Sequence, residues 1–204
     1  MAKKGLSKLV IAKYSAENDV VTYANPAIQE KLAEYSVELD SAEPNNLYLD
    51  NEIAETDGGT FVSGTLNLVT GDLSNETSKL FFNTKQTEIT VGDKKITEIT
   101  YDDEIKPQEL GVGVIELHQV NNVEFYRAVW LDRVKFNLPN NAATTKGETV
   151  EWQTQEISGT IMRSDAAGHP WKHHADCSTE AEALTYLMYK GGKTTTETTE
   201  AGSE

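Results

Sequence analysis

The sequence predicts a mostly β (α+β) domain in which two antiparallel sheets pack together as a sandwich or barrel, flanked by one or two helices. Three observations lead to this prediction. Several segments alternate apolar and polar residues, two pairs of segments are joined by dipeptides typical of β-hairpin turns, and only two segments have apolar residues at helical spacing. The chain has 204 residues, enough to bury a real core.

The first predicted strands lie in the N-terminal part of the chain. Residues 5–14 (GLSKLVIAKY) have β-branched residues at their centre and are followed by turn residues. In residues 35–40 (YSVELD), two apolar residues alternate with two acids, so one strand face should carry Val37 and Leu39 and the other Glu38 and Asp40.

A strand at residues 61–69 (FVSGTLNLV) is predicted next, followed by a short helix. One face of the strand is expected to carry Val62, Leu66 and Leu68, and the other Ser63, Thr65 and Asn67. The helix could be capped by Asp72 or Ser74, with an apolar face made of Leu73, Leu80 and Phe81.

Two β-hairpins follow. In residues 86–100 (QTEITVGDKKITEIT), Gly92 and Asp93 separate two alternating segments, and glycine at the first central position indicates a type II′ turn. Residues 111–120 and 123–131 are joined through Asn121-Asn122, and asparagine tolerates the positive φ of a type I′ turn. The second of these strands is expected to extend the sheet through residues 134–136.

The last third of the chain predicts a long polar strand and then a helix. Residues 146–165 (KGETVEWQTQEISGTIMRSD) spread a few apolar side chains among polar ones. Ser178 or Thr179 should begin a helix that Gly191-Gly192 ends. We expect residues 1–190 to form one domain and residues 191–204 to be a low-complexity, disordered tail.

The chain is strongly acidic, with 33 acids against 18 bases and a net charge of −15. Residues 17–57 alone contain eleven acids and one base. Such a surface repels phosphate and lacks the cations that displace counterions from nucleic acids, so direct nucleic-acid or anionic-membrane binding is disfavoured. A run of acids is more often a solvated face than a functional surface.

Neither disulfides nor targeting segments are expected. The single cysteine, Cys177, excludes an internal disulfide and suits a reducing compartment. The apolar run between Lys8 and Lys13 is too short for a signal peptide, and no segment has the length of a transmembrane helix. These features predict a soluble, unsecreted chain.

No catalytic constellation is evident, so we expect no enzyme activity, no cofactor and no metal. The richest set of candidate metal ligands lies in residues 169–177 (HPWKHHADC) and comprises His169, His173, His174, Asp176 and Cys177. The only other histidine, His118, is isolated, whereas zinc sites usually draw ligand pairs from separate segments. The simpler interpretation is an exposed turn anchored by Trp171. No Gly-x-Ser-x-Gly motif and no calcium-loop spacing occurs.

An ordered set of segments resembles the major tail tube protein of bacteriophages with long, non-contractile (siphovirus-type) tails. No single segment is diagnostic, and together they span most of residues 5–190 in the family's order. The hairpin at residues 86–100 and the histidine-rich segment depart from the family pattern. The matching segments are GLSKLVIAKY, LYLDNEIAE, FVSGTLNLVTGDLS, GVGVIE, YRAVWLDRVKF, KGETVEWQTQEISGTIM and the closing WK…STEAEALTYL.

The resemblance implies subunits that form hexameric rings stacked into a hollow tube, in which the inner sheets of neighbours form one continuous barrel around the lumen. The implied partners are further copies of the chain, a tape-measure protein inside the tube, and distal tail and tail terminator proteins at its ends. Genomic DNA would pass through without specific binding, and the protein would be located in the virion.

The resemblance also suggests roles for particular residues. Acids on a channel wall would repel the DNA backbone. The candidates for lumen-facing residues are Glu38, Asp40, Glu151, Gln153 and Gln155, with outer solvent as the alternative for each. The segments 47–59 and 83–107 are expected to be inter-ring loops. The inter-ring candidates in them are Asp50, Asn51, Glu52, Glu55, Asp57, Gly92 and Asp93.

Two other classes of function remain open. One is a carbohydrate- or receptor-binding β-sandwich module of a phage tail, which would be expected to display clustered exposed aromatic residues. The other is a metal hydrolase built on the histidine-rich segment. Images of rings or tubes would distinguish a tube subunit from both, and metal analysis would test the hydrolase.

Overall fold

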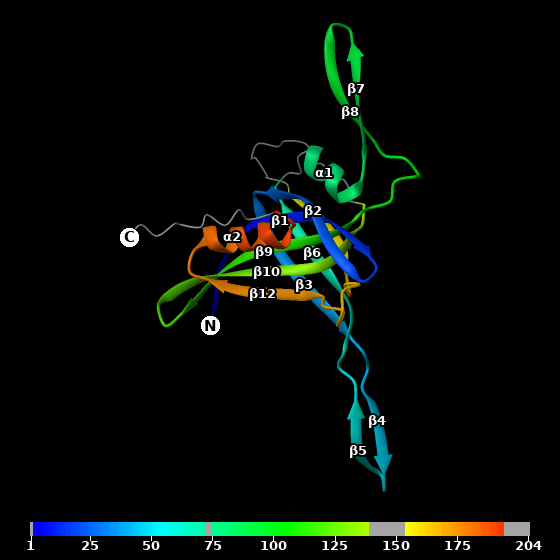
Figure 1. The fold of residues 1–204 in the computed structure, drawn as a ribbon, viewed down its shortest axis with the longest axis vertical. Helices are drawn as coiled ribbons and strands as arrows, with labels where there is room; N and C mark the ends of the chain where they lie inside the picture. Colours follow the sequence, from blue (N-terminus) through cyan, green and yellow to red (C-terminus); the bar gives the residue numbers. More distant parts are fainter. Residues whose placement is uncertain (1, 72–74, 139–153, 194–204) are drawn as a thin grey trace, which may run out of the picture.

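The computed structural model describes residues 2–71, 75–138 and 154–193, and it shows a β-rich body with a hairpin projecting from each of two opposite ends (Figure 1). The predicted mostly β fold with antiparallel strands and two helices is confirmed. The helices are α1 (Asn75–Phe82) and α2 (Glu180–Lys190). The described strands are β1 (Ala2–Glu17), β2 (Val20–Gln29), β3 (Leu32–Ser41), β4 (Asn45–Leu49), β5 (Glu52–Asp57), β6 (Phe61–Thr70), β7 (Lys85–Val91), β8 (Lys94–Thr100), β9 (Glu109–Val120), β10 (Val123–Phe136), β11 (Gln155–Met162) and β12 (Lys172–Cys177).

The body is built on one antiparallel sheet in the order β2-β1-β9-β10-β11-β6-β3, with β12 paired to β10. The long strand β10 holds the sheet together, because residues 126–131 pair with β12 and residues 133–136 pair with β11. A register shift against β9 lies between Leu131 and Val134. The two packed layers are therefore hydrogen-bonded halves of one sheet, β2-β1-β9-β10 and β11-β6-β3, rather than two separate sheets.

The main core lies between these two halves. Alternate apolar residues of β1, β9 and β10 meet those of β6 and β11, and α1 packs against this cluster with two phenylalanines. The rings of Phe81 and Phe136 make an edge-to-face contact at 4.6 Å. The fully buried members include Leu9, Ile11, Leu66, Leu68, Phe81, Phe82, Val112, Leu131, Phe136, Ile157 and Ile161.

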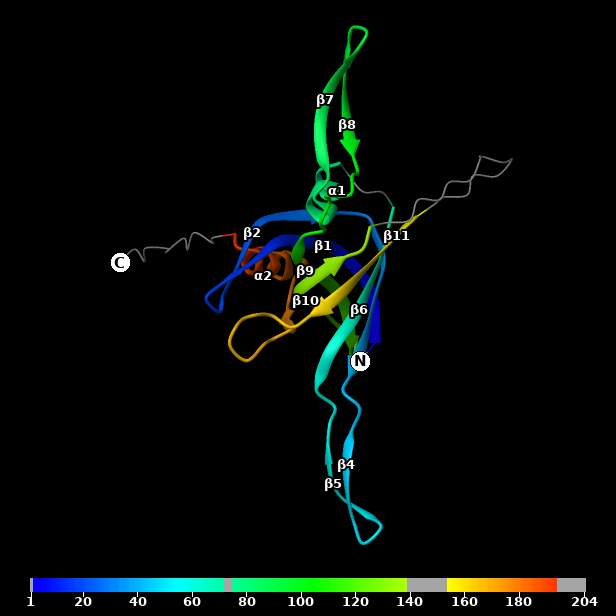
Figure 2. The ribbon, with the colours of Figure 1, turned by 90° about the vertical axis from the view of Figure 1, so that its right-hand side faces the viewer.

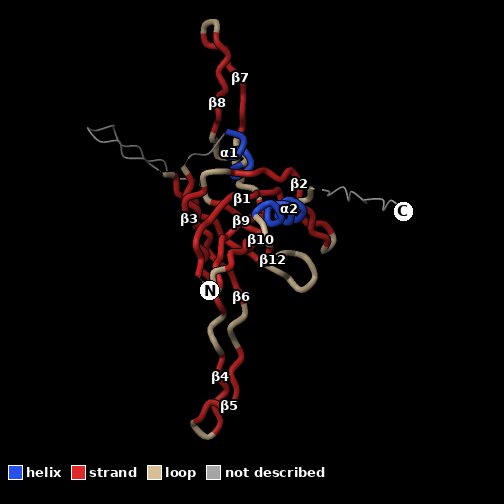
Figure 3. Tube along the Cα trace, turned by 90° about the vertical axis from the view of Figure 1, so that its left-hand side faces the viewer, coloured by secondary structure: helices blue, strands red, loops and turns tan. Residues whose placement is uncertain are grey.

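A second cluster lies on the other face of β1, β9 and β10, where α2 covers the sheet (Figure 3). Burial on both faces explains why these strands read as nearly continuous apolar runs. Gly113 allows the close packing, since a Cβ there would lie 2.8 Å from Leu187 and 2.9 Å from Trp130. The helix begins with a capping box in which Thr179, the second of the two predicted caps, accepts from the Glu182 backbone N–H.

Both predicted hairpin turns are confirmed. Gly92 has φ +62°, as the first central residue of a type II′ turn requires, and Asn121 and Asn122 have φ +48° and +68°. The predicted loop between residues 47 and 59 is instead a third hairpin, β4–β5. Its turn residues, Asp50 and Asn51, have φ +53° and +67°.

Two details of the predicted strands differ from the structure. Val62 shares a strand face with Leu66 but is 52% exposed, although its neighbour Phe61 packs against the core and stacks on Trp171. The predicted polar strand of the last third begins, as far as it is described, at Gln155. No described helix has both the length and the apolar character needed to cross a membrane.

Candidate functional site

A polar sheet face is the first candidate surface. Along β3, β6 and β11 one face is turned to the core, and the opposite face is polar because the strands alternate. Its cross-strand pairs include Glu38 with Thr65 and Asp40 with Ser63. The Ser63 hydroxyl donates to the Asp40 carboxylate at 2.9 Å. Its members are Glu34, Ser36, Glu38, Asp40, Ser63, Thr65, Asn67, Val69, Glu156, Ser158, Thr160 and Met162.

This β3–β6–β11 face is acidic as well as polar. It carries four carboxylates and, among the described residues of the three strands, no lysine or arginine. Lys135 of β10 lies at its border, paired with Thr160. A sheet face with this composition stays hydrated and repels a polyanion.

The lumen-facing candidates do not all lie on this face. Glu38 and Asp40 do, and both are exposed. Gln155 is half-buried, and strand alternation places it on the side of Ile157 and Ile161, which faces the core. Glu156, which was not among the predicted lumen-facing residues, lies on the polar face instead of Gln155. Glu151 and Gln153 lie outside the described residues.

The edges of the large sheet are the second candidate surface. β2 and β3 are the outermost strands in its order, so the outer edge of each is not paired with any described strand. β3 is ten residues long and is also one border of the acidic face. An edge strand of this length offers backbone N–H and C=O groups that a second chain could bind.

The two projecting hairpins are the third candidate surface. The β4–β5 arm and the β7–β8 arm extend in opposite directions from the body (Figures 1 and 2), and neither packs extensively against another described element. All seven inter-ring candidates lie on them. Asp50, Asn51, Gly92 and Asp93 form the two turns at the tips, Glu52 and Glu55 lie in β5, and Asp57 pairs with Asn45 at the base of its arm.

The arms expose large apolar side chains that sequence reasoning did not single out. On β4–β5 these are Leu47, Tyr48, Leu49 and Ile53, and on β7–β8 they are Ile89, Val91 and Ile96. An isolated two-stranded hairpin is at best marginally stable in water. Exposed apolar side chains on a projecting hairpin are typical of surfaces that contact other molecules.

A scan against protein-family models and a search of curated proteins found no match to this chain.

The histidine-rich segment is spread out by the structure. His173 and His174 lie on opposite sides of β12, the ring of His169 contacts the Ser164 carbonyl at 3.0 Å, and Asp176 forms a bidentate pair with Arg127 at 2.6 and 2.9 Å. Among the described residues, no group of three or more potential ligands is arranged to hold a metal ion. Burial raises the pKa of the Cys177 thiol, which lowers its reactivity.

A buried carboxylate, Glu116, connects the two halves of the sheet and was not predicted. It accepts hydrogen bonds from Lys3 and Tyr35, each at 2.6 Å, and lies 2.7 Å from the His118 ring. Burial alone would raise the pKa of Glu116, but these three hydrogen bonds lower it below its ordinary value. The sequence did contain a signal for its burial. Glu116 and His118 continue the alternation of Val112 and Val114, which places them on the core-facing side of the strand.

A second buried acid, Asp132, lies near α2. The Tyr23 hydroxyl donates to its carboxylate at 3.2 Å and to its backbone carbonyl at 3.0 Å, and His173 Nε2 lies 3.1 Å from Oδ2. Burial raises the pKa of Asp132, although His173 and Lys190 oppose the shift. These groups join β2, β10 and β12.

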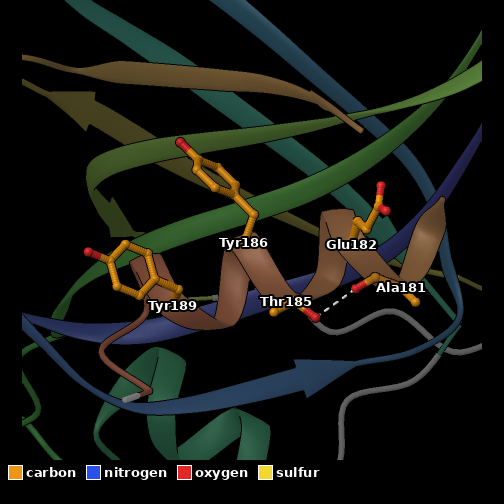
Figure 4. Close-up of a pocket in the computed structure, with 5 residues that line it drawn as sticks. All are labelled: Ala181, Glu182, Thr185, Tyr186 and Tyr189. Atoms are coloured by element: carbon orange, nitrogen blue, oxygen red, sulfur yellow. Dashed lines mark hydrogen bonds between the residues drawn. The ribbon is translucent and has the colours of Figure 1, made fainter. Parts of the chain in front are cut away.

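The outer side of α2 carries an open hollow of about 490 Å³ lined by Ala181, Glu182, Thr185, Tyr186 and Tyr189. Figure 4 shows the two tyrosine rings side by side along the helix, with Tyr189 toward its end. Tyr189 is exposed and Tyr186 is half-buried against the second core cluster, and an aromatic ring that is accessible in this way can stack on a sugar. This hollow, in the part of the chain that the structure describes, favours the receptor-binding alternative.

Proposed function

We propose that this protein is a structural subunit of a bacteriophage tail tube. Copies join edge to edge into rings, in the hexameric arrangement implied by the family resemblance, and the rings stack into a hollow tube. The β3–β6–β11 face lines the bore, and the genome passes along it during ejection. Tape-measure, distal tail and tail terminator proteins are the further partners proposed on the same resemblance.

The observation that carries the proposal is an acidic sheet face that ends at an unpaired strand. The strands β3, β6 and β11 pack against the subunit core with their apolar face, and their opposite, polar face can face water. Because β3 lies at the border of that face, pairing its edge with a neighbour would extend the same face around a ring.

Electrostatics supports a conduit for DNA. The DNA backbone carries about one negative charge per 1.7 Å of helix axis. The carboxylates of Glu34, Glu38, Asp40 and Glu156 on the bore wall would repel it and prevent adhesion. The wall thus excludes the polymer from its surface without any specific contact.

Assembly of the purified protein tests the proposal. We expect concentrated protein to form rings and hollow tubes in negative-stain images. Protein that remains a single globule at all concentrations, with or without tail-end proteins as nucleators, would contradict the proposal.

Charge reversal on the bore wall tests the conduit role. Tubes of the double variant Glu38→Lys/Asp40→Lys should retain DNA that wild-type tubes do not bind. The matched control is Glu17→Lys/Asp19→Lys, which makes the same change of charge at the exposed β1–β2 turn. Equal DNA retention by the two double variants would show that the location of the acids is irrelevant.

The receptor-binding alternative concerns the hollow on α2. A glycan array probed with the wild-type chain and with Tyr186→Ala/Tyr189→Ala examines it directly. Sugar binding that the double variant loses would favour the receptor-binding module over the tube subunit.

A further inference from the structure

We propose that the β4–β5 arm of one copy packs on the β7–β8 arm of a second copy placed head to tail, through one defined face of each hairpin. This inference rests on the proposed function and names the partner surfaces within it. The contact joins two different surfaces of identical chains, so it repeats along a stack instead of closing on itself.

The β4–β5 arm has one face that combines leucines with acids. Cross-strand pairing joins Leu49 to Glu52 and Leu47 to Glu55, so these four side chains lie on the same face. The two leucines are 52% and 59% exposed. Tyr48 and Ile53, which pair with each other, lie on the opposite face.

The β7–β8 arm has one face that combines β-branched residues with a lysine. Ile89 pairs with Ile96, and Val91 pairs with Lys94, which places all four on one face next to the turn. The opposite face is polar near the tip. There, Lys95 forms an ion pair with Glu88 at 3.2 Å.

The two faces are complementary in charge and in apolar character. Residues 45–57 contain four acids and no base, so this arm has no cation of its own to pair with Glu52. Lys94, which has no acidic partner among the described residues, supplies the opposite charge on the other arm. The apolar side chains on both faces would be removed from water by the same contact.

The placement of the arms selects a second copy as the partner. The arms extend from opposite ends of the body, so one chain cannot bring its own two faces together (Figures 1 and 3). Stacking two copies along the long axis brings the lower arm of one toward the upper arm of the other. A contact at this position would fix the axial register of successive rings.

Reciprocal charge reversal tests the contact. Glu52→Lys or Lys94→Glu alone should raise the critical concentration for tube formation about tenfold or more, because each places like charges in contact. The double variant Glu52→Lys/Lys94→Glu in one chain restores an opposite pair at every contact and should recover tubes. The matched control is Lys95→Glu on the other face of the same arm, which should assemble as the wild type does.

The outcomes separate this inference from the proposed function. The arm-to-arm contact would be overturned if the double variant failed to recover tubes, or if Lys94→Glu and Lys95→Glu impaired tube assembly equally. In either case, tubes formed by the wild type would still support the proposed conduit function. Normal assembly of both single reversals would also overturn the arm-to-arm contact. Absence of tubes from the wild type would reject the proposed function and this inference together. Circular dichroism of each variant distinguishes lost assembly from lost folding.

Discussion

Removal of the β4–β5 arm should separate folding from assembly. Ala42 and Thr60 are joined by a backbone hydrogen bond of 2.9 Å at the base of the arm. Residues 44–58 can therefore be replaced by Asn-Gly, which favours a tight hairpin turn. No residue of either core cluster lies in the deleted segment. We expect a folded chain that does not form tubes.

The effect of this deletion on stability can be worked out from the length of the connection. The replacement shortens the connection between residues 42 and 60 to about a quarter of its length, which is two successive halvings. Each halving of a loop reduces the free-energy cost of closing it by about 0.6 kcal/mol. The free energy of unfolding should therefore rise by about 1 kcal/mol, or the Tm by about 2–4 °C for a domain of this size.

Urea unfolding and negative-stain microscopy measure the two outcomes. The control is Asn122→Gly at the turn between β9 and β10, which preserves the positive φ of that turn and should leave assembly unchanged. Tubes of normal length from the shortened chain would refute the role of the arm. A stability loss above about 2 kcal/mol would show that the arm belongs to the folding unit, since surface changes rarely cost as much.

Further predictions concern the body. Glu116→Ala should lower the free energy of unfolding by about 3 kcal/mol, because Tyr35 and His118 lose a buried partner; a loss below about 1 kcal/mol in urea titration would contradict this. Because the pKa of Glu116 is lowered in the folded state, its carboxylate adds to the free energy of unfolding above about pH 4.3. This added stability is lost as the pH falls through the folded-state pKa. Glu116→Gln should therefore make stability depend less on pH in the acid range. Gly113→Ala should cost about 1–3 kcal/mol through overpacking against Trp130 and Leu187, and an unchanged Tm would argue against this packing.

Local features of the fold were predictable because their signals are local. The hairpins at Gly92 and Asn121 are encoded by residues that tolerate positive φ, and the alternation around Val37 fixed the exposed face that carries Glu38 and Asp40. The last helix followed from its cap and apolar spacing. Each of these signals lies within a few neighbouring residues.

The order of strands could not be predicted in the same way. β1 pairs with β9 and β3 pairs with β6 across long stretches of chain, and strand alternation does not specify such partners. Alternation likewise cannot distinguish one bent sheet from two packed ones. That distinction depends on the two successive partners of β10.

Part of the candidate site was assigned to the wrong strand face for a specific reason. The apolar positions Val150 and Trp152 and the later positions Ile157 and Ile161 differ in parity, so no single alternation fits residues 150–161. The alternation set by Val150 and Trp152 predicted that Gln155 lies on the polar face. In the structure the alternation is set by Ile157 and Ile161, which places Gln155 on the core-facing side. The apolar residues of the β4–β5 arm were hard to interpret because exposed and core-facing leucines give the same pattern.

A cryo-electron microscopy map of assembled wild-type protein would show which surface of the subunit forms the bore. We expect stacked rings in which the β3–β6–β11 face lines the bore, with the carboxylates of Glu38 and Asp40 directed into it. A tube whose bore is formed by another surface, with these carboxylates on the outside or buried between subunits, would contradict this expectation.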